Sequence, residues 1–151
     1  MFQFENKSHL YSSLFFMNNI RLSTSIHIMT LLAYQKDEVL SSDYIASSIN
    51  INPAVVRKEI SNLKKYNLVE SKEGKGGGNL LGKPAKEILL SDIYKAVLQK
   101  SVLGKTNDTN PKCPVGKQIN KHLKNLYSEA EMSLLKRMEK ISLGDFIKQF
   151  K

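Results

Sequence analysis

The amino-acid sequence predicts a mainly α-helical fold with one small β-hairpin and a long helix near the C-terminus. Apolar residues recur three and four positions apart in several segments, which is typical of amphipathic helices. Two short apolar runs flank the glycine-rich stretch 74–78, as in a hairpin. A further apolar stripe runs from Val115 to Ile141. A chain of 151 residues has room for one domain and an accessory element, and it needs no metal or disulfide to fold.

Residues 1–19 contain apolar side chains without a sustained period, and we expect an N-terminal extension there. The longest apolar run, Leu14–Met17, is shorter than the apolar region of a signal peptide, and no cleavage pattern follows it. Three interpretations stay open. The extension is a disordered or loosely packed arm, or the start codon is assigned too early and Met17 is the natural start, or an amphipathic arm packs on the domain or on a second subunit.

Residues 20–91 are predicted to form the folded domain, which begins with a helix from Ser23 to about Tyr34. Serine is a favoured N-cap residue because its side chain accepts a hydrogen bond from the first helical turn. The apolar stripe of this helix is expected to face the core, and it comprises Ile28, Leu31 and Leu32.

Two further helices are expected close together, before and after residues 50–52. Ser41 or Ser42 caps the first of them. Asn50 tolerates the left-handed conformation that ends a helix, and Asn52 is a strong N-cap. Pro53 fits the first helical position because the N–H that it lacks would be unpaired there. Two helices joined by so short a turn form a helix-turn-helix.

The outer face of the third helix is predicted to be strongly basic. Residues 52–86 hold eight Lys/Arg and three Asp/Glu, a net charge of +5 within a chain whose total is +9. A solvated basic helix is the alternative, but this position on the second helix of the motif is typical of a helix that reads the DNA major groove. The residues on this face are Ala54, Arg57, Lys58, Ser61, Lys64 and Lys65.

The hairpin that follows the helix-turn-helix is the wing of a winged helix. Lys72 and Lys75 supply positive charge, and the consecutive glycines at 76–78 allow the backbone to approach a phosphate or a minor-groove wall. A flexible loop without a target is the alternative. The predicted architecture is therefore a winged helix-turn-helix followed by a long C-terminal dimerisation helix.

Residues 92–151 are predicted to form a sensor loop and dimerisation helices. A helix capped by Ser91–Asp92 is expected to reach about Lys100, and the polar loop 104–114 follows it. The next helix, of roughly 26 residues, is too long for a winged helix of about 70 residues to cover. We expect the same helix of a second copy to cover it, with packing inside one chain as the alternative. The candidate dimerisation residues are Ile119, Leu123, Leu126, Ala130, Leu134 and Met138.

Enzymatic activity is not expected. Gly77, Gly82 and Lys83 have the spacing of a phosphate-binding P-loop, but Pro84 stands where that loop needs a Ser or Thr for its metal ion. The sequence has no Ser/His/Asp ordering typical of nucleophilic catalysis and no pair of metal ligands, so neither a metal nor a cofactor is predicted.

The net charge of +9 favours a polyanionic partner, and double-stranded DNA rather than a membrane is expected. No apolar run approaches the ~18 residues of a membrane span. The single cysteine excludes an internal disulfide and is typical of a reducing compartment, so a cytoplasmic location is expected. A winged-helix module for protein interaction or dimerisation, without specific DNA binding, is the alternative function.

Several segments between residue 20 and about residue 140 resemble the Rrf-two type winged-helix transcriptional regulators. The stretch Ser25–Ile28 is similar to a branch of that family without an iron–sulfur cluster. The matching segments are Ile20–Thr24, Ser42–Ile49, Val56–Leu68, Gly74–Gly78 followed by Lys83–Pro84, and Ile88–Ile93.

The resemblance implies a dimeric, sequence-specific DNA-binding regulator, usually a repressor. The third helix would read a partly palindromic operator, and the wing would lie on the minor groove. Asn79 and Leu80 stand where the family often has Tyr and Arg. The candidate DNA-binding residues are Arg21, Ser23, Thr24, Ala54, Arg57, Lys58, Ser61, Lys64, Lys65, Lys72, Lys75, Gly76, Gly77, Gly78 and Asn79.

Cys113 is a candidate redox sensor. It precedes the predicted long helix, and Lys117 follows one turn later; a helix N-terminus and a nearby ammonium group both stabilise the reactive thiolate. The alternative is a small apolar side chain that fills a gap in the packing. Cluster-bearing members of the family place three cysteines in this loop, so the resemblance with only Cys113 present implies no iron–sulfur cluster.

Overall fold

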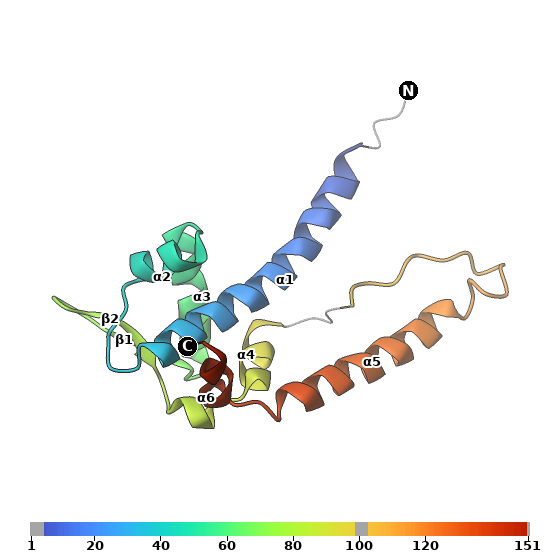
Figure 1. The fold of residues 1–151 in the computed structure, drawn as a ribbon. Coiled ribbons are helices and arrows are strands. Elements are labelled where there is room, and N and C mark those ends of the chain that lie inside the picture. The colour runs from blue at the N-terminus through green and yellow to red at the C-terminus, as the bar shows by residue number, and fades with distance from the viewer. Residues whose placement is uncertain (1–4, 99–102, 151) are drawn as a thin grey trace.

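The computed structural model describes residues 5–98 and 103–150, with side chains from Ile20 onward. Most of the helices and the hairpin form one body, from which α5 and the N-terminal half of α1 extend (Figure 1). The elements are α1 (Glu5–Tyr34), α2 (Ser42–Ile49), α3 (Pro53–Lys65), β1 (Val69–Lys72), β2 (Gly78–Leu81), the 3-10 helix η1 (Ala85–Glu87), α4 (Leu90–Val97), α5 (Ile119–Met138), α6 (Leu143–Phe146) and the 3-10 helix η2 (Ile147–Gln149).

Helix α1 begins at Glu5, so the prediction that a helix starts at Ser23 is wrong. Ser23 lies inside the helix, where its hydroxyl donates a hydrogen bond to the Ile20 carbonyl at 2.9 Å. A serine hydroxyl can bond back to the preceding turn in this way, and it is therefore tolerated within a helix. Residues 5–19 continue the same helix, whereas residues 1–4 lie outside the described residues.

The core lies where α1, α2, α3, α4 and α6 meet. Full burial of an aliphatic side chain stabilises the folded state by about 1.5–3 kcal/mol, so these side chains fix how the helices pack. The fully buried residues from the five helices include Ile28 and Leu32, Ile45, Val56 and Leu63, Ile93, and Leu143.

The turn between α2 and α3 follows the predicted capping chemistry. The Ser41 side chain accepts a hydrogen bond from the Tyr44 amide, and Asn50 ends α2 with a φ of 60°. Asn52 accepts a hydrogen bond from the Ala54 amide at 2.8 Å, which caps α3 ahead of Pro53. The helix-turn-helix is thereby confirmed.

The wing is an antiparallel hairpin in which Val69 pairs with Leu81 and Lys72 pairs with Gly78. Its connection contains glycines with positive φ, 86° at Gly74 and 74° at Gly76, a conformation that side chains with a Cβ rarely adopt. The sequence therefore specifies the turn. The fold as a whole is mainly helical with one small hairpin, as predicted.

Helix α4 is capped differently from the prediction. The Asp92 carboxylate accepts a hydrogen bond from the Leu89 amide at 2.9 Å, whereas the buried Ser91 hydroxyl has no hydrogen-bond partner among the described residues. The helix ends at Val97, and Lys100, its predicted end, lies outside the described residues.

Helix α5 has 20 residues and starts at Ile119, so it is shorter than predicted. Residues 111–118 form turns instead, because Pro111, Pro114 and Gly116 interrupt regular helix there. Two polar contacts connect α5 and the residue after it to α4. The Tyr94 hydroxyl donates to Glu131 at 2.9 Å, and Lys95 pairs with Glu139 at 3.2 Å.

The C-terminal segment returns to the body after α5. The Leu90 amide donates to the Ile141 carbonyl at 3.0 Å, and the Leu143 amide donates to the Ile88 carbonyl at 2.7 Å. Ser142 caps α6, as its side chain accepts a hydrogen bond from the Asp145 amide at 3.0 Å. These bonds hold α6 and η2 against α1, next to the winged helix.

Candidate nucleic-acid interface

Helix α3 separates its apolar residues from its basic residues. Val56 and Leu63 are fully buried, and Ile60 is 5% exposed. The opposite face is open to solvent, and all six predicted residues of this face are exposed: Ala54, Arg57, Lys58, Ser61, Lys64 and Lys65. The packing of the inner face therefore fixes a row of cationic and small polar side chains on the outside of the body.

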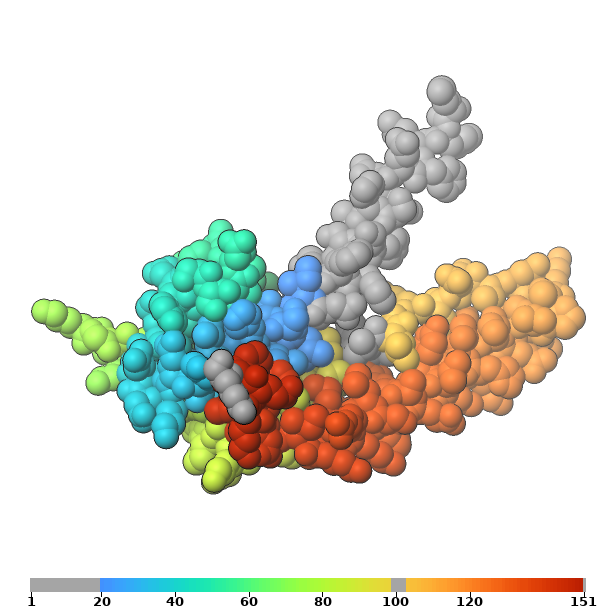
Figure 2. Space-filling model, viewed as in Figure 1, coloured from blue at the N-terminus to red at the C-terminus, as the bar shows by residue number. Residues whose placement is uncertain are grey.

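The wing lies next to this basic face. The wing projects from the end of the molecule opposite to α5 (Figure 2). A groove of about 270 Å³ runs between the wing and the basic face, and its hydroxyl and cationic groups are the types that bind phosphate oxygens. It is lined by Ser42, Arg57, Ile60, Ser61, Lys64, Ser71 and Asn79.

Arg57 lies 3.6 Å from the Asp43 carboxylate of α2, and both side chains are mostly exposed. Exposed ion pairs of this kind contribute about 0–1 kcal/mol. The pair therefore leaves the Arg57 guanidinium available to an anionic ligand.

The wing separates into a tip and a base. Lys72, Lys75 and Gly76 are exposed at the tip, whereas Gly77 and Gly78 are half-buried. A Cβ added to Gly78 would lie 2.7 Å from the Leu40 carbonyl oxygen, so this glycine permits close packing of the base. The tip of the wing extends into solvent, whereas the second strand begins at a half-buried position.

Asn79 has a structural role in the wing, and its predicted contact with DNA stays a prediction. It is 6% exposed. Its Nδ2 donates to the Leu40 carbonyl at 3.1 Å, and its Oδ1 accepts a hydrogen bond from the Ser71 hydroxyl at 2.9 Å. The backbones of Leu40 and Asn79 are also paired, with N–O distances of 2.8 and 2.9 Å. Asn79 therefore anchors the wing to the segment before α2.

Three of the predicted DNA-binding residues, Arg21, Ser23 and Thr24, lie on α1, outside the groove between α3 and the wing. Thr24 is 3% exposed, so its side chain has little surface for the predicted contact with DNA, which stays a prediction. Ser23 is exposed, but it lines a different pocket, beside His27 and Phe150. Arg21 is engaged by the buried carboxylate of Glu59 on α3.

Arg21 and Glu59 form a two-point ion pair. Nε lies 2.6 Å from Oε1, and Nη2 lies 3.2 Å from Oε2. The hydrogen bond to Glu59 raises the pKa of Arg21, and burial opposes this effect. The pair was not predicted from the sequence, although an acidic residue among the inner positions of α3 indicates that a cationic partner must be buried with it.

The stripe predicted for dimerisation is poorly covered. Over the whole length of α5, no residue is buried. Ile119, Leu123 and Met138 are half-buried, whereas Leu126 is 58% and Leu134 is 41% exposed, and Ala130 is exposed too. Met132, outside the predicted stripe, is 55% exposed.

None of the helices in the described parts of the chain is both long and apolar enough to cross a bilayer.

The model of the Rrf2 family, described as iron-dependent transcriptional regulators, matches residues 19–149. The match includes the helix-turn-helix, the wing and α5. The chain belongs to the Rrf2 family.

Individual Rrf2 relatives match over most of their length. The Bacillus subtilis (strain 168) protein YwnA, described as a candidate HTH-type transcriptional regulator, is 39% identical over 130 residues, which cover 85% of this chain and 96% of YwnA. A crystal structure of a candidate DNA-binding protein is 38% identical, with a TM-score of 0.68, over 84% of this chain and 98% of that one. CymR, the global cysteine regulator of B. subtilis, has a TM-score of 0.66 at 21% identity over 87% of this chain and 95% of CymR.

These likenesses confirm the predicted winged-helix fold and the predicted family. Because Rrf2 proteins are transcriptional regulators, this chain is a transcription regulator. The relatives are regulators and not enzymes, in agreement with the function predicted from the sequence.

The iron dependence in the description of the Rrf2 family does not fit the residues of this chain. A [2Fe–2S] cluster is held by four protein ligands, mostly cysteine thiolates. The chain has one cysteine, Cys113. Among the described side chains, those of residues 20–98 and 103–150, no group of three or more from His, Cys, Asp or Glu is placed to hold a metal ion.

Cys113 is exposed, and it lies six residues before α5 rather than directly at a helix N-terminus. Its amide donates to the Asn110 carbonyl at 3.2 Å, and its carbonyl accepts from the Lys117 amide at 2.9 Å. The exposure of this side chain in the single chain gives the packing interpretation no support, and both interpretations stay predictions. The surrounding turns leave the thiol open to solvent.

Proposed function

We propose that the chain acts as a homodimer that binds a partly palindromic DNA operator through α3 and the wing, and that it represses transcription by covering a promoter. The observation that carries the proposal is the exposed basic face of α3 beside the wing. The inner face of the same helix is fully packed, so the basic side chains are held on a rigid element rather than on a loop.

The side chains of this face suit different parts of a duplex. Arg57 and Ser61 can donate hydrogen bonds to base edges in the major groove, where arginine makes a bidentate contact with guanine. Lys58, Lys64 and Lys65 are suited to phosphates, which position a protein on DNA without reading sequence. Lys72 and Lys75 on the wing would contact the backbone along the minor groove.

The apolar residues of α5 support the homodimer. Large side chains such as Leu126 and Leu134 lie in water when the chain is alone. A second copy that packs its own α5 against them would bury both stripes through one self-complementary interface. The two α3 helices would then occupy successive major grooves, about 34 Å apart.

DNA binding is tested by a salt titration with DNA from the region upstream of the coding sequence. The variant Arg57→Ala with Lys58→Ala removes two exposed cations of α3, and its matched control, Lys136→Ala with Arg137→Ala, removes the same two residue types from α5. We expect affinity to fall steeply with salt, and the slope to decrease in the first variant alone, by about 0.9 for each DNA phosphate that is no longer neutralised. Equal affinities of the two variants would favour the alternative of an interaction module without specific DNA binding.

Exposure of the Cys113 thiol favours a redox response of this regulator. Peroxide would convert the thiolate to sulfenate and be reduced to water, a reaction that requires access to the sulfur. The reducing cytoplasm that we propose as the location would keep the thiol reduced until the oxidant arrives. Operator affinity is compared before and after peroxide for the wild type and for Cys113→Ser. An oxidant response that persists in the variant would assign the effect to another residue.

A further inference from the structure

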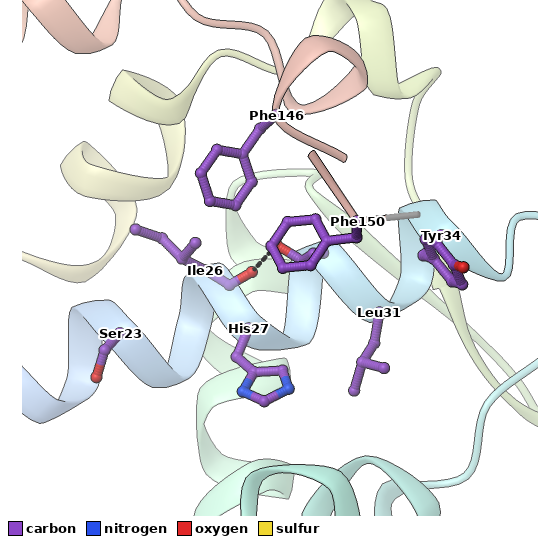
Figure 3. Close-up of a pocket in the computed structure, with 8 residues that line it drawn as sticks. Ser23, Ile26, His27, Leu31, Tyr34, Phe146 and Phe150 are labelled. Carbon is purple, nitrogen blue, oxygen red and sulfur yellow. Dashed lines mark hydrogen bonds between the residues drawn. The ribbon is translucent and has the colours of Figure 1, made fainter. Parts of the chain in front are cut away.

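A second pocket lies on the side of α1 that faces the C-terminal helices. It has a volume of about 550 Å³, within the roughly 300–1,000 Å³ typical of sites for small molecules. Figure 3 shows Phe146 and Phe150 on one side of α1 and His27 and Leu31 on the other. The lining residues are Ser23, Ile26, His27, Thr30, Leu31, Tyr34, Phe146 and Phe150.

The walls of this pocket, which we call the α1–α6 pocket, are aromatic and aliphatic. The Phe146 and Phe150 rings are tilted by 59° with centroids 5.5 Å apart, a favourable aromatic pair. Phe150 is 48% and Tyr34 is 54% exposed, so two large rings at the rim stay in contact with water. A bound apolar molecule would remove these surfaces from water.

The polar side chains among the described lining residues are few: Ser23, His27, Thr30 and Tyr34. No Lys, Arg, Asp or Glu is among the described residues that line it. The Thr30 hydroxyl already donates to the Ile26 carbonyl at 2.7 Å. A charged ligand would lose hydration there without gaining an ionic partner. The lining therefore favours a neutral ligand.

His27 connects this pocket to the helix-turn-helix. Its Nε2 lies in hydrogen-bond contact with the Ser48 hydroxyl of α2, at 3.2 Å. Its Nδ1 makes no hydrogen bond to the residues whose side chains are described, so this atom is available for a hydrogen bond with a ligand. A ligand hydrogen-bonded to His27 would contact the same imidazole that is bonded to α2. Helix α2 in turn packs against α3 in the helix-turn-helix.

We propose that the α1–α6 pocket binds a small, uncharged aromatic molecule with one hydrogen-bonding group, and that its occupancy changes the affinity of the chain for DNA through His27 and Ser48. The effect on DNA rests on the proposed function. A second copy of the chain is the competing occupant of an exposed apolar surface. The small molecule is favoured because the apolar stripe available to a second copy lies on another helix, α5, whereas this pocket is concave and set between α1 and α6.

Binding is tested with N-phenyl-1-naphthylamine, a neutral aromatic fluorophore with one N–H, whose emission rises when it leaves water. The full-length wild type is titrated beside Phe150→Ala and Tyr34→Ala. Met132→Ala is the matched control, since Met132 is 55% exposed but lies on α5. We expect about tenfold weaker binding in each pocket variant and unchanged binding in the control. Equal loss in all three variants would overturn the site, and two pocket variants at half-exposed positions guard against loss of folding in one.

Coupling is tested by measuring DNA affinity with and without the same fluorophore. We expect a change of about fivefold or more in the wild type, and no change in Ser48→Ala, which still binds the fluorophore. If the wild type binds DNA equally well with and without the fluorophore, the regulatory inference fails while the proposed function stands. If it binds no DNA at all, the proposed function fails. Displacement of the fluorophore by dimerisation, as protein concentration rises, would assign the pocket to a second copy and overturn the proposal.

Discussion

Arg21 of α1 and Glu59 of α3 are joined by two hydrogen bonds, 2.6 and 3.2 Å long, on the inner side of α3. Glu59 is nearly inaccessible, with a side chain 3% exposed, whereas Arg21 is 34% exposed. The Ser25 hydroxyl adds a third donor to the same carboxylate at 3.5 Å. This pair links α1 to the buried side of α3, and together with the apolar residues of that side it leaves the basic side chains of α3 facing outward.

Removal of Arg21 should destabilise the fold strongly. We expect Arg21→Ala to lower the free energy of unfolding by about 3 kcal/mol, because Glu59 would stay buried without a cationic partner. The double variant Arg21→Met with Glu59→Leu should recover most of this loss, since it buries no charge. Urea denaturation followed by circular dichroism measures both. A single variant as stable as the wild type would contradict the importance of the pair.

Asn79 should hold the wing against the body. We expect Asn79→Ala to destabilise the chain by about 1–3 kcal/mol, because the buried Leu40 carbonyl and the part-buried Ser71 hydroxyl would each lose the hydrogen bond made by the Asn79 side chain. Amide exchange in residues 69–81 should accelerate in particular. Ser42→Ala, which removes only a 3.5 Å interaction with Asn79, serves as the control and should leave exchange nearly unchanged.

The packing of α4 against α5 should weaken at alkaline pH. Burial first, and then the hydrogen bond and the charge of Glu131, raise the pKa of Tyr94 well above its usual range. The neutral phenol is therefore favoured in the folded state. Its contribution to stability is complete below the pKa of an unfolded tyrosine, about 10, and is lost as pH rises above that value.

The variant Tyr94→Phe tests this relationship, because it has no phenol to titrate. We expect its free energy of unfolding to fall less steeply than that of the wild type between about pH 9 and pH 11. Tyr66→Phe is the control, since Tyr66 is 45% exposed. Identical pH profiles of the wild type and Tyr94→Phe would contradict the effect of burial on Tyr94.

Charges placed on the apolar stripe of α5 should separate the proposed dimer. Leu126→Glu with Leu134→Glu introduces two carboxylates at positions that are 58% and 41% exposed in the single chain. We expect monomers in sedimentation equilibrium and at least tenfold weaker DNA binding, because two half-sites no longer act together. Ser128→Glu lies on the opposite side of α5 and should remain dimeric. A wild type that sediments as a monomer would count against the homodimer.

The elements that the sequence predicts correctly are those whose causes are local. The helix-turn-helix depends on Ser41, Asn50 and Asn52, whose side chains or backbones act on amides and carbonyls a few residues away. The outer face of α3 likewise follows from helical periodicity alone. The start of α1 differs from the prediction. Serine is a favoured N-cap by residue type, but Ser23 lies inside a helix that has already begun at Glu5.

Tertiary contacts determine which polar residues are buried and where a pocket forms, and helical periodicity cannot predict either. Asn79 and Thr24 look like surface polar residues in the sequence, yet segments distant in the chain bury both. The α1–α6 pocket depends on residues 23–34 meeting Phe146 and Phe150, more than a hundred positions later. Caps and helical stripes are set by neighbours along the chain, so the sequence alone determined the winged helix and its basic face. Burial, ion pairing and concavity depend on which distant surfaces come together, and the folded structure alone decided them.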